Sequence, residues 1–399
     1  MKRKTMLLLM FIVFLFLSNL VFSQEKDKRL TFATESGLGI QFSGEVELEY
    51  INVEGQGGFA NKDLTFQKVK TRSPHIRIDK AIFAPTIFYG ENLTYKIELG
   101  YNDTKALVDK HYARLKVPAI NSLFELGKNR PMIKTDRLTE GYPLVGTAFW
   151  KGREYHLTAK SEFPISENFS LNGGLSAAMK RPLGTDDLAE DKSFKTIVYD
   201  DYDVKDGQTT EYGIMGGLEA LGFYATGWYF MGELIDDFDW KIQLSQTLSD
   251  YDNLAAEVGK PVNDMTHYWY GGRVGFDRWG LRARAEYING QDGVLPRDGW
   301  YVEGSYIMDV SNFLPINSIT ALARYDELYV RNILPRMGET ESWDRQMATL
   351  ALIADLNKYI FLKVEYYMLE EDMNTDENGL ITNDEVLDDQ LLIQLHFTF

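Results

Sequence analysis

The sequence predicts an all-β fold, a transmembrane antiparallel up-and-down barrel of about sixteen strands. Segments of roughly ten residues alternate apolar and polar side chains, which is the period of a strand with one apolar face. The chain ends on such a segment, and a barrel closes only when its last strand pairs with its first. Aromatic residues make up 13% of the 399 residues, as expected where rings gather at two membrane interfaces.

Composition and charge argue against several other classes of protein. The chain has no Cys, so we expect neither disulfides nor a lipid-anchored N-terminal Cys. The net charge of −17 makes binding to nucleic acid unfavourable, because phosphates repel an acidic surface. The acidic residues instead predict a solvated outer surface.

Residues 1–23 have the pattern of a secretory signal peptide. Lys2, Arg3 and Lys4 precede an apolar run over residues 6–17. A retained membrane helix is the alternative, but the run is shorter than the ~20 residues that spanning needs. We therefore expect removal of residues 1–23, a short periplasmic segment over residues 24–37, and an outer-membrane barrel over residues 38–399.

The first predicted strand covers residues 38–50 and places a row of carboxylates on its inner face. Its apolar side chains alternate with Glu45, Glu47 and Glu49. Three neighbouring carboxylates are costly in a dry core but not against water. The pattern therefore predicts a water-filled lumen.

Fifteen further strands follow from the same alternation. They cover residues 74–87, 92–101, 106–117, 123–130, 154–162, 169–180, 210–220, 223–232, 267–276, 279–289, 299–309, 318–328, 346–356, 359–370 and 390–399.

Residues 240–249 also alternate and decide the strand count. The short turns expected at residues 221–222, 277–278 and 357–358 alternate correctly with long loops only if residues 240–249 lie in one extracellular loop. The count is then sixteen, an even number that places both termini on the periplasmic side. If the stretch is a barrel strand, the count is eighteen.

The last predicted strand, residues 390–399, closes the barrel. It has polar residues, among them His396, on the inner face. Its outer, lipid-facing residues are Leu391, Ile393, Leu395, Phe397 and Phe399.

Two stretches resemble the phosphate-selective porin (O and P) family. Residues 107–130 read LVDKHYARLKVPAINSLFELGKNR, with an acidic residue, an aromatic and a basic "RL" pair before a turn and a Gly-Lys. Residues 275–293 and 299–308 are similar to a later hairpin of this family, in which Glu286 and Tyr287 lead into the loop.

The resemblance implies an outer-membrane porin of a Gram-negative bacterium, in contact with lipid and lipopolysaccharide. It implies a homotrimer whose channel passes small hydrophilic solutes or ions, including anions, by passive diffusion. It also implies a constricting loop after the fifth strand, here residues 131–153. The predicted pore lining has both signs, so phosphate specificity is not carried over. The lining candidates are Glu45, Glu47, Glu49, Arg77, Arg114, Lys134, Arg137, Arg282, Arg284 and Arg324.

Arg282 and Arg284 stand two residues apart on one predicted strand, so both are expected to point inward. They would either guide anions or pair with carboxylates such as Glu303 on the next strand. Pairing is the favoured interpretation.

Residues 374–385 have the spacing of an EF-hand loop, with oxygen side chains at Asn374, Asp376, Asn378 and Glu385. Asn replaces the usual first Asp and the flanks are strands, so a solvated acidic loop is favoured over a calcium site. No other cofactor is expected.

The pattern of reactive residues does not predict an enzyme. The His residues are scattered and no nucleophile motif is present. Three alternatives remain open: a barrel with a blocked lumen that binds a ligand or partner, an outer-membrane hydrolase, and a secreted soluble β-protein. The long excursion over residues 233–266 favours the first of these.

Overall fold

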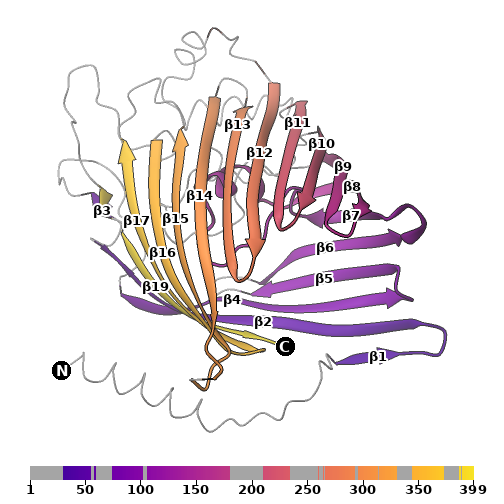
Figure 1. Ribbon diagram of the computed structural model, residues 1–399, viewed down its shortest axis with the longest axis horizontal. Helices are drawn as coiled ribbons and strands as arrows, with labels where there is room; N and C mark the ends of the chain where they lie inside the picture. Colours follow the sequence, from indigo (N-terminus) through magenta and orange to yellow (C-terminus); the bar gives the residue numbers. More distant parts are fainter. Residues whose placement is uncertain are drawn as a thin grey trace.

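Sixteen antiparallel strands form a closed ring (Figure 1). The computed structural model describes residues 30–54, 58–59, 74–101, 106–179, 210–233, 259, 264, 266–292, 295–312, 314–329, 344–372, 386–387 and 389–399. Each wall strand pairs with its neighbours along the chain, which confirms the predicted barrel. The wall strands are β2 (Leu38–Val53), β4 (His75–Tyr89), β5 (Leu93–Tyr101), β6 (Ala106–Val117), β7 (Ser122–Asn129), β8 (Glu154–Ser166), β9 (Phe169–Met179), β10 (Thr210–Ala220), β11 (Phe223–Glu233), β12 (Thr266–Arg278), β13 (Leu281–Asp292), β14 (Leu295–Asp309), β15 (Ser318–Tyr329), β16 (Asp344–Asn357), β17 (Ile360–Asp372) and β19 (Gln390–Thr398).

The ring closes where the last strand meets the first. β19 runs antiparallel to β2, in a register from Gln390 opposite Val53 to Thr398 opposite Glu45. We call this strand pair the seam. It uses the free edges of both terminal wall strands, so the ladder of backbone hydrogen bonds continues around the barrel.

β11 pairs directly with β12 along the whole length of β11, from Phe223 opposite Phe276 to Glu233 opposite Thr266. No wall strand fits between them, so the eighteen-stranded alternative is wrong. The stretch at 240–249 itself lies outside the described residues. So do the predicted signal peptide, 1–23, and the predicted calcium loop, 374–385.

Two predicted turns are displaced. The chain turns at Trp279-Gly280, not at residues 277–278, because Arg278 is the register partner of Leu281. The second displaced turn is at residues 358–359, not 357–358, because Asn357 is the register partner of Ile360. At Trp279 and Gly280 φ is 56° and 78°, and two-residue hairpin turns of this kind need positive φ at both positions. The predicted turn at residues 221–222 is confirmed.

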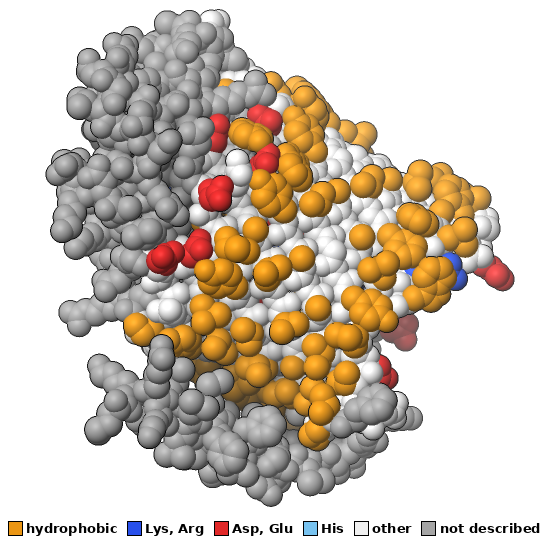
Figure 2. Space-filling model, turned by 60° about the vertical axis from the view of Figure 1, so that its left-hand side comes forward, with side chains coloured by type: hydrophobic (Ala, Val, Ile, Leu, Met, Phe, Trp, Pro, Cys, Tyr) orange, Lys and Arg blue, Asp and Glu red, His pale blue; other side chains and the backbone are white. Residues whose placement is uncertain are grey.

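The two faces of the wall differ as the alternation predicts. On β16, Leu350 and Leu352 are 52% and 56% exposed, whereas Thr349 and Ala351, which alternate with them, are buried. Figure 2 shows hydrophobic side chains spread over the visible outer wall, with charged ones toward its edges.

Among the described residues, no helix has the length and apolar character needed to cross a membrane.

Within the described ranges, three short strands lie outside the wall. β1 (Thr31–Ala33) pairs with residues 39–41 of β2, beyond the point where β19 ends. The amide of Phe42 donates to the carbonyl of Leu30, and Gly44 exchanges two hydrogen bonds with Phe399. β1 therefore covers the part of β2 that projects past the seam. Elsewhere, β3 (Gly58–Phe59) pairs with β18 (Val386–Leu387).

The turn at Trp279-Gly280 predicts a stability difference between two glycine substitutions. Gly280→Ala places a side chain at φ 78°, with its Cβ 2.8 Å from the carbonyl oxygen of Ile307. We expect a loss of about 1–2 kcal/mol of unfolding free energy. Gly304→Ala is the control, because its Cβ meets no atom within 4 Å. Urea unfolding should separate the two variants, and equal midpoints would contradict the assignment of the turn.

Candidate functional site

The segment between β7 and β8, residues 130–153, lies inside the ring; we call it the inner loop. It ends in a short π-helix, η3 (Gly146–Trp150). Its apolar side chains, including Phe149 and Trp150, are buried against aromatic residues of the inner wall. Phe149 stacks on Trp269 at 5.9 Å, and Trp269 stacks on Phe230 at 4.2 Å. The predicted inward fold of this loop is therefore what the structure contains.

Arginines of the wall hold the inner loop through its backbone. Arg273 donates to the carbonyl of Ile133 at 3.0 Å, and Arg284 donates to the carbonyl of Asp136 at 2.8 Å. Arg324 donates to the Thr139 hydroxyl at 2.9 Å and to two loop carbonyls at 3.2 Å. Donors that are rigid and always charged suit carbonyl oxygens buried away from water.

Each of these arginines also pairs with a carboxylate on the wall. The pairs are Arg273 with Glu286 at 2.5 Å, Arg284 with Glu303 at 2.8 Å and Arg324 with Asp326 at 2.8 Å. The predicted pairing of Arg284 with Glu303 is present.

The placement of Arg282, Arg284 and Arg324 corrects their assignment to the open pore. Arg284 and Arg324 are only 5% and 3% exposed, because the inner loop covers them. Arg282 pairs with Asp277 at 2.9 Å, close to the turn at the end of the hairpin. The alternation placed all three arginines on the inner face, but it could not show that the inner loop covers Arg284 and Arg324.

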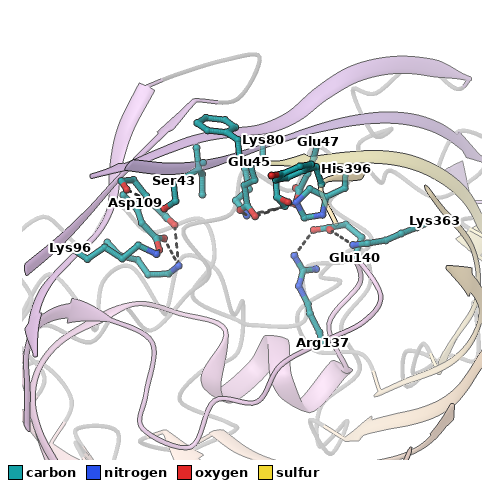
Figure 3. Close-up of a pocket in the computed structure, with 18 of the residues that line it drawn as sticks. Ser43, Glu45, Glu47, Lys80, Lys96, Asp109, Arg137, Glu140, Lys363 and His396 are labelled. Carbon is teal, nitrogen blue, oxygen red and sulfur yellow. Dashed lines mark hydrogen bonds and ion pairs between the residues drawn. The ribbon is translucent and has the colours of Figure 1, made fainter. Parts of the chain in front are cut away.

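A cavity of about 620 Å³ occupies the side of the lumen that the inner loop leaves open. Residues of β2, β4, β5, β6, β17 and β19 form its wall, and the inner loop forms the opposite side (Figure 3). Its charged lining comprises seven basic residues and five carboxylates. They are Lys80, Lys96, Lys110, Arg130, Arg137, Lys358 and Lys363, with Glu45, Glu47, Glu98, Asp109 and Glu140.

Ion pairs join most of these charges within the wall. Glu98 lies 2.7 Å from Lys96 and 2.5 Å from Lys110. Asp109 pairs with Arg153 at 2.5 Å, and Lys80 contacts Glu45. Pairing fixes the side chains around the cavity, and the basic residues outnumber the carboxylates.

Glu140 projects from the inner loop toward the wall. Arg137 lies 2.5 Å from it, Gln394 donates to it at 3.1 Å and Lys363 lies 3.6 Å away (Figure 3). Burial alone would raise the pKa of Glu140, but Arg137 and Lys363 outweigh it and hold that pKa well below its usual range. The same pair raises the pKa of Arg137 against the effect of burial.

Tyr142 of the inner loop gathers three cations around its ring. Arg137, Arg130 and Lys151 lie 4.2, 5.0 and 5.2 Å from the ring centroid. The face of an aromatic ring attracts cations and holds them without neutralising their charge. Arg130 and Arg137 of this cluster line the cavity on the side formed by the inner loop.

The other predicted lining residues lie in different surroundings. Glu45, Glu47 and Arg137 line the cavity, and Lys134 is exposed on the inner loop. Glu49 is 1% exposed and is bound by Arg77 at 3.0 Å and Gln394 at 2.7 Å. Fixed polar side chains rather than bulk water therefore compensate Glu49, and Glu47 is also buried. Arg114 pairs with Glu125 at 2.6 Å.

Lys80 is a lining residue that simple alternation misses. Glu47 pairs with Lys80 but Leu48 pairs with Ile78, so Asp79 forms a β-bulge. The bulge reverses the inward and outward positions of β4: Ile76 is 72% exposed before it, and Phe83 is 44% exposed after it. The sequence contains a signal of this change, because its apolar residues shift from even to odd numbers.

Comparisons with known proteins identify the fold. No model of a known protein family matches the chain, and no curated protein matches it. Solved structures do match. OmpF of Salmonella typhi in complex with daunomycin has a TM-score of 0.57 at 12% identity, over 92% of this chain and 99% of that one.

Two further structures match over a similar length. The outer membrane channel DcaP of Acinetobacter baumannii has a TM-score of 0.54 at 13% identity, over 92% of this chain and 99% of that one. An anion-selective porin from Comamonas acidovorans has a TM-score of 0.50 at 10% identity, over 91% and 100%. At these identities the comparisons show the fold: the chain shares the closed barrel architecture of these outer-membrane proteins.

The contacts of Arg324 predict a large loss of stability when it is replaced. Arg324→Met removes one of the three arginines that hold the inner loop and leaves the fully buried Asp326 without its ionic partner. We expect a loss of about 3–5 kcal/mol, the usual effect of breaking a buried pair.

The matched control is Arg282→Met, whose pair with Asp277 is partly exposed and should contribute about 1 kcal/mol or less. Urea unfolding should separate these two variants, with faster proteolysis of the inner loop only in Arg324→Met. Similar midpoints and similar proteolysis would show that the wall arginines do not anchor the loop.

The lowered pKa of Glu140 predicts a pH-dependent effect. Ionised Glu140 stabilises the fold, so its contribution is complete above its ordinary pKa of 4.5 and is lost as the pH falls through its lower folded value. Glu140→Gln should therefore unfold at a lower temperature than the unaltered protein at pH 7. The difference should narrow as the pH falls below 4.5. A difference that stays constant with pH would assign the effect to packing.

Proposed function

We propose that this protein is an outer-membrane porin of a Gram-negative bacterium, through which small hydrophilic solutes or ions diffuse passively. The observation that carries this proposal is the polar cavity inside the barrel, lined by charged side chains of both signs. The inner loop, residues 131–153 in particular, forms one side of the cavity and acts as the constriction. A lining of fixed, paired charges suits rapid passage of hydrated solutes better than tight binding.

The outer wall supports a place in the membrane. Large apolar residues dominate its exposed face, as lipid contact requires. Rings also gather at the hairpin turns: Phe276 lies 4.6 Å from Phe223 and 5.9 Å from Trp279, which is 75% exposed. Aromatic side chains in such positions are typical of membrane interfaces.

The charges of the cavity favour anions. Basic residues outnumber carboxylates, and the lining residue Arg130 lies over the uncharged ring of Tyr142. We propose a modest preference for anions and leave phosphate specificity aside, because no motif in the described lining selects a particular anion. DcaP is described as an outer membrane channel, which agrees with a channel function. The Comamonas acidovorans protein is described as an anion-selective porin, which agrees with a preference for anions.

A barrel with a blocked lumen is the second candidate function. The inner loop and the wall together bury an apolar cluster, including Phe149, Trp150 and Trp269, inside the ring. Such a dry plug narrows the passage and suits a barrel that binds a ligand or a surface partner. We propose no catalytic site.

Assembly as a homotrimer in contact with lipopolysaccharide is part of the proposal. Among the matching structures, one is described as the trimer form of OmpT of Vibrio cholerae, with a TM-score of 0.52 at 10% identity. Size measurements of the detergent-extracted protein test this assembly.

Planar-bilayer recordings test the channel. The purified protein should open stable conductances and show a reversal potential displaced toward anions in a salt gradient. Lys96→Gln should shift that potential toward cations, because Lys96 lines the cavity. Arg282→Gln, at the edge of the wall, should leave it unchanged. A folded protein without conductance would favour the blocked barrel, and equal potentials in both variants would remove this cavity from the permeation path.

A further inference from the structure

Three ligand groups meet across the seam, on the wall of the cavity. Glu45 and Glu47 come from β2 and His396 from β19, and His396 is the register partner of Glu47. Nε2 of His396 lies 3.3 Å from Oε2 of Glu45 and 3.7 Å from Oε1 of Glu47. One ligand atom from each of the three residues lies within 4.8 Å of the other two. Figure 3 shows the three side chains turned toward one another beside Lys80.

Two atoms of this group have unused bonding capacity. Glu47 is only 2% exposed, yet its Oε2 has no hydrogen-bond partner among the described residues. Nε2 of His396 also makes no hydrogen bond of normal geometry there. A buried carboxylate oxygen without a partner is unfavourable, and a cation would relieve it.

We propose that Glu45, Glu47 and His396 form a site for a zinc-like divalent transition-metal ion that bridges the seam. Zinc bonds of ~2.0–2.2 Å in tetrahedral geometry place neighbouring ligand atoms roughly 3.3–3.5 Å apart. The separations of 3.3 and 3.7 Å at His396 are close to that range. Two carboxylates and one imidazole leave a fourth position for water or for an anion in the cavity.

The ligand set selects among cations. Calcium and magnesium prefer sites made of oxygen atoms, whereas an imidazole ligand favours zinc, copper or nickel. Phe361 packs beside the His396 ring at 5.9 Å and restricts its orientation. The cavity provides an entry path, because all three ligand residues line it.

Lys80 is the competitor for this site. Its ammonium contacts Oε1 of Glu45 and lies 3.8 Å from Oε1 of Glu47, so it neutralises part of the charge that a metal ion would use. Oε2 of Glu45 and Oε1 of Glu47 are the carboxylate oxygens nearest Nε2 of His396, so Lys80 and the ion compete directly for Oε1 of Glu47. Removing the charge of Lys80 should therefore tighten metal binding.

Equilibrium dialysis of the full-length, detergent-extracted protein with Zn²⁺ tests the site, after treatment with a chelator. His396→Gln and Glu47→Gln should lower the Zn²⁺ affinity by at least the roughly tenfold that loss of an outer-shell partner causes. Lys80→Gln should raise the affinity, and excess Mg²⁺ should not displace Zn²⁺. The control is His111→Gln, because His111 packs against the exposed Tyr155 and lies outside the cavity lining.

Heat-modifiable migration on a gel identifies variants that still fold. If His396→Gln does not fold, Lys80→Gln and Mg²⁺ competition decide the question alone. Zn²⁺ affinities that are the same in His396→Gln and His111→Gln, or displacement by Mg²⁺, would overturn the site. Dialysis measures Zn²⁺ binding and not ion conductance. The metal site can therefore be confirmed even if the protein forms no channel.

Discussion

The hydrogen bonds from wall arginines to the backbone of the inner loop determine how the lumen is divided. Arg273, Arg284 and Arg324 stand on β12, β13 and β15, and each joins a wall carboxylate to a loop oxygen. They draw the loop toward one side of the ring, where its aromatic residues find an apolar surface. The cavity exists on the other side because the loop is held away from it.

The barrel therefore contains two environments that usually occur in different proteins. Under the inner loop, stacked aromatic rings and fully buried side chains form a core like that of a soluble domain. Across the lumen, paired charges face an open space. Buried arginines connect the two, because a guanidinium group can satisfy a carboxylate and several carbonyls at once. Loss of one such group disturbs both the core and the shape of the cavity.

Period and turn chemistry were sufficient to predict the sixteen strands and the closure of β19 on β2. The local sequence pattern does not show which segments far apart in the chain contact one another. Arg284 and Arg324 were correctly placed on the inner face, but only tertiary contacts reveal the loop that covers them. The bulge at Asp79 reversed the two faces of β4 within one residue, so Lys80 was missed. The cluster of Glu47 and His396 depends on a register between the two ends of the chain, and no spacing in the sequence shows it.

The position of the seam has a consequence for biosynthesis. Gln394 binds Glu49 across a separation of 345 residues, so the final strand must emerge before the first can acquire its permanent neighbour. Until then β2 presents an unpaired edge, the kind of surface that invites association with other chains. Contacts between such distant segments also form slowly, because a large loop has to close. β1 shields only the projecting end of β2, so the rest of that edge stays unpaired until β19 reaches it.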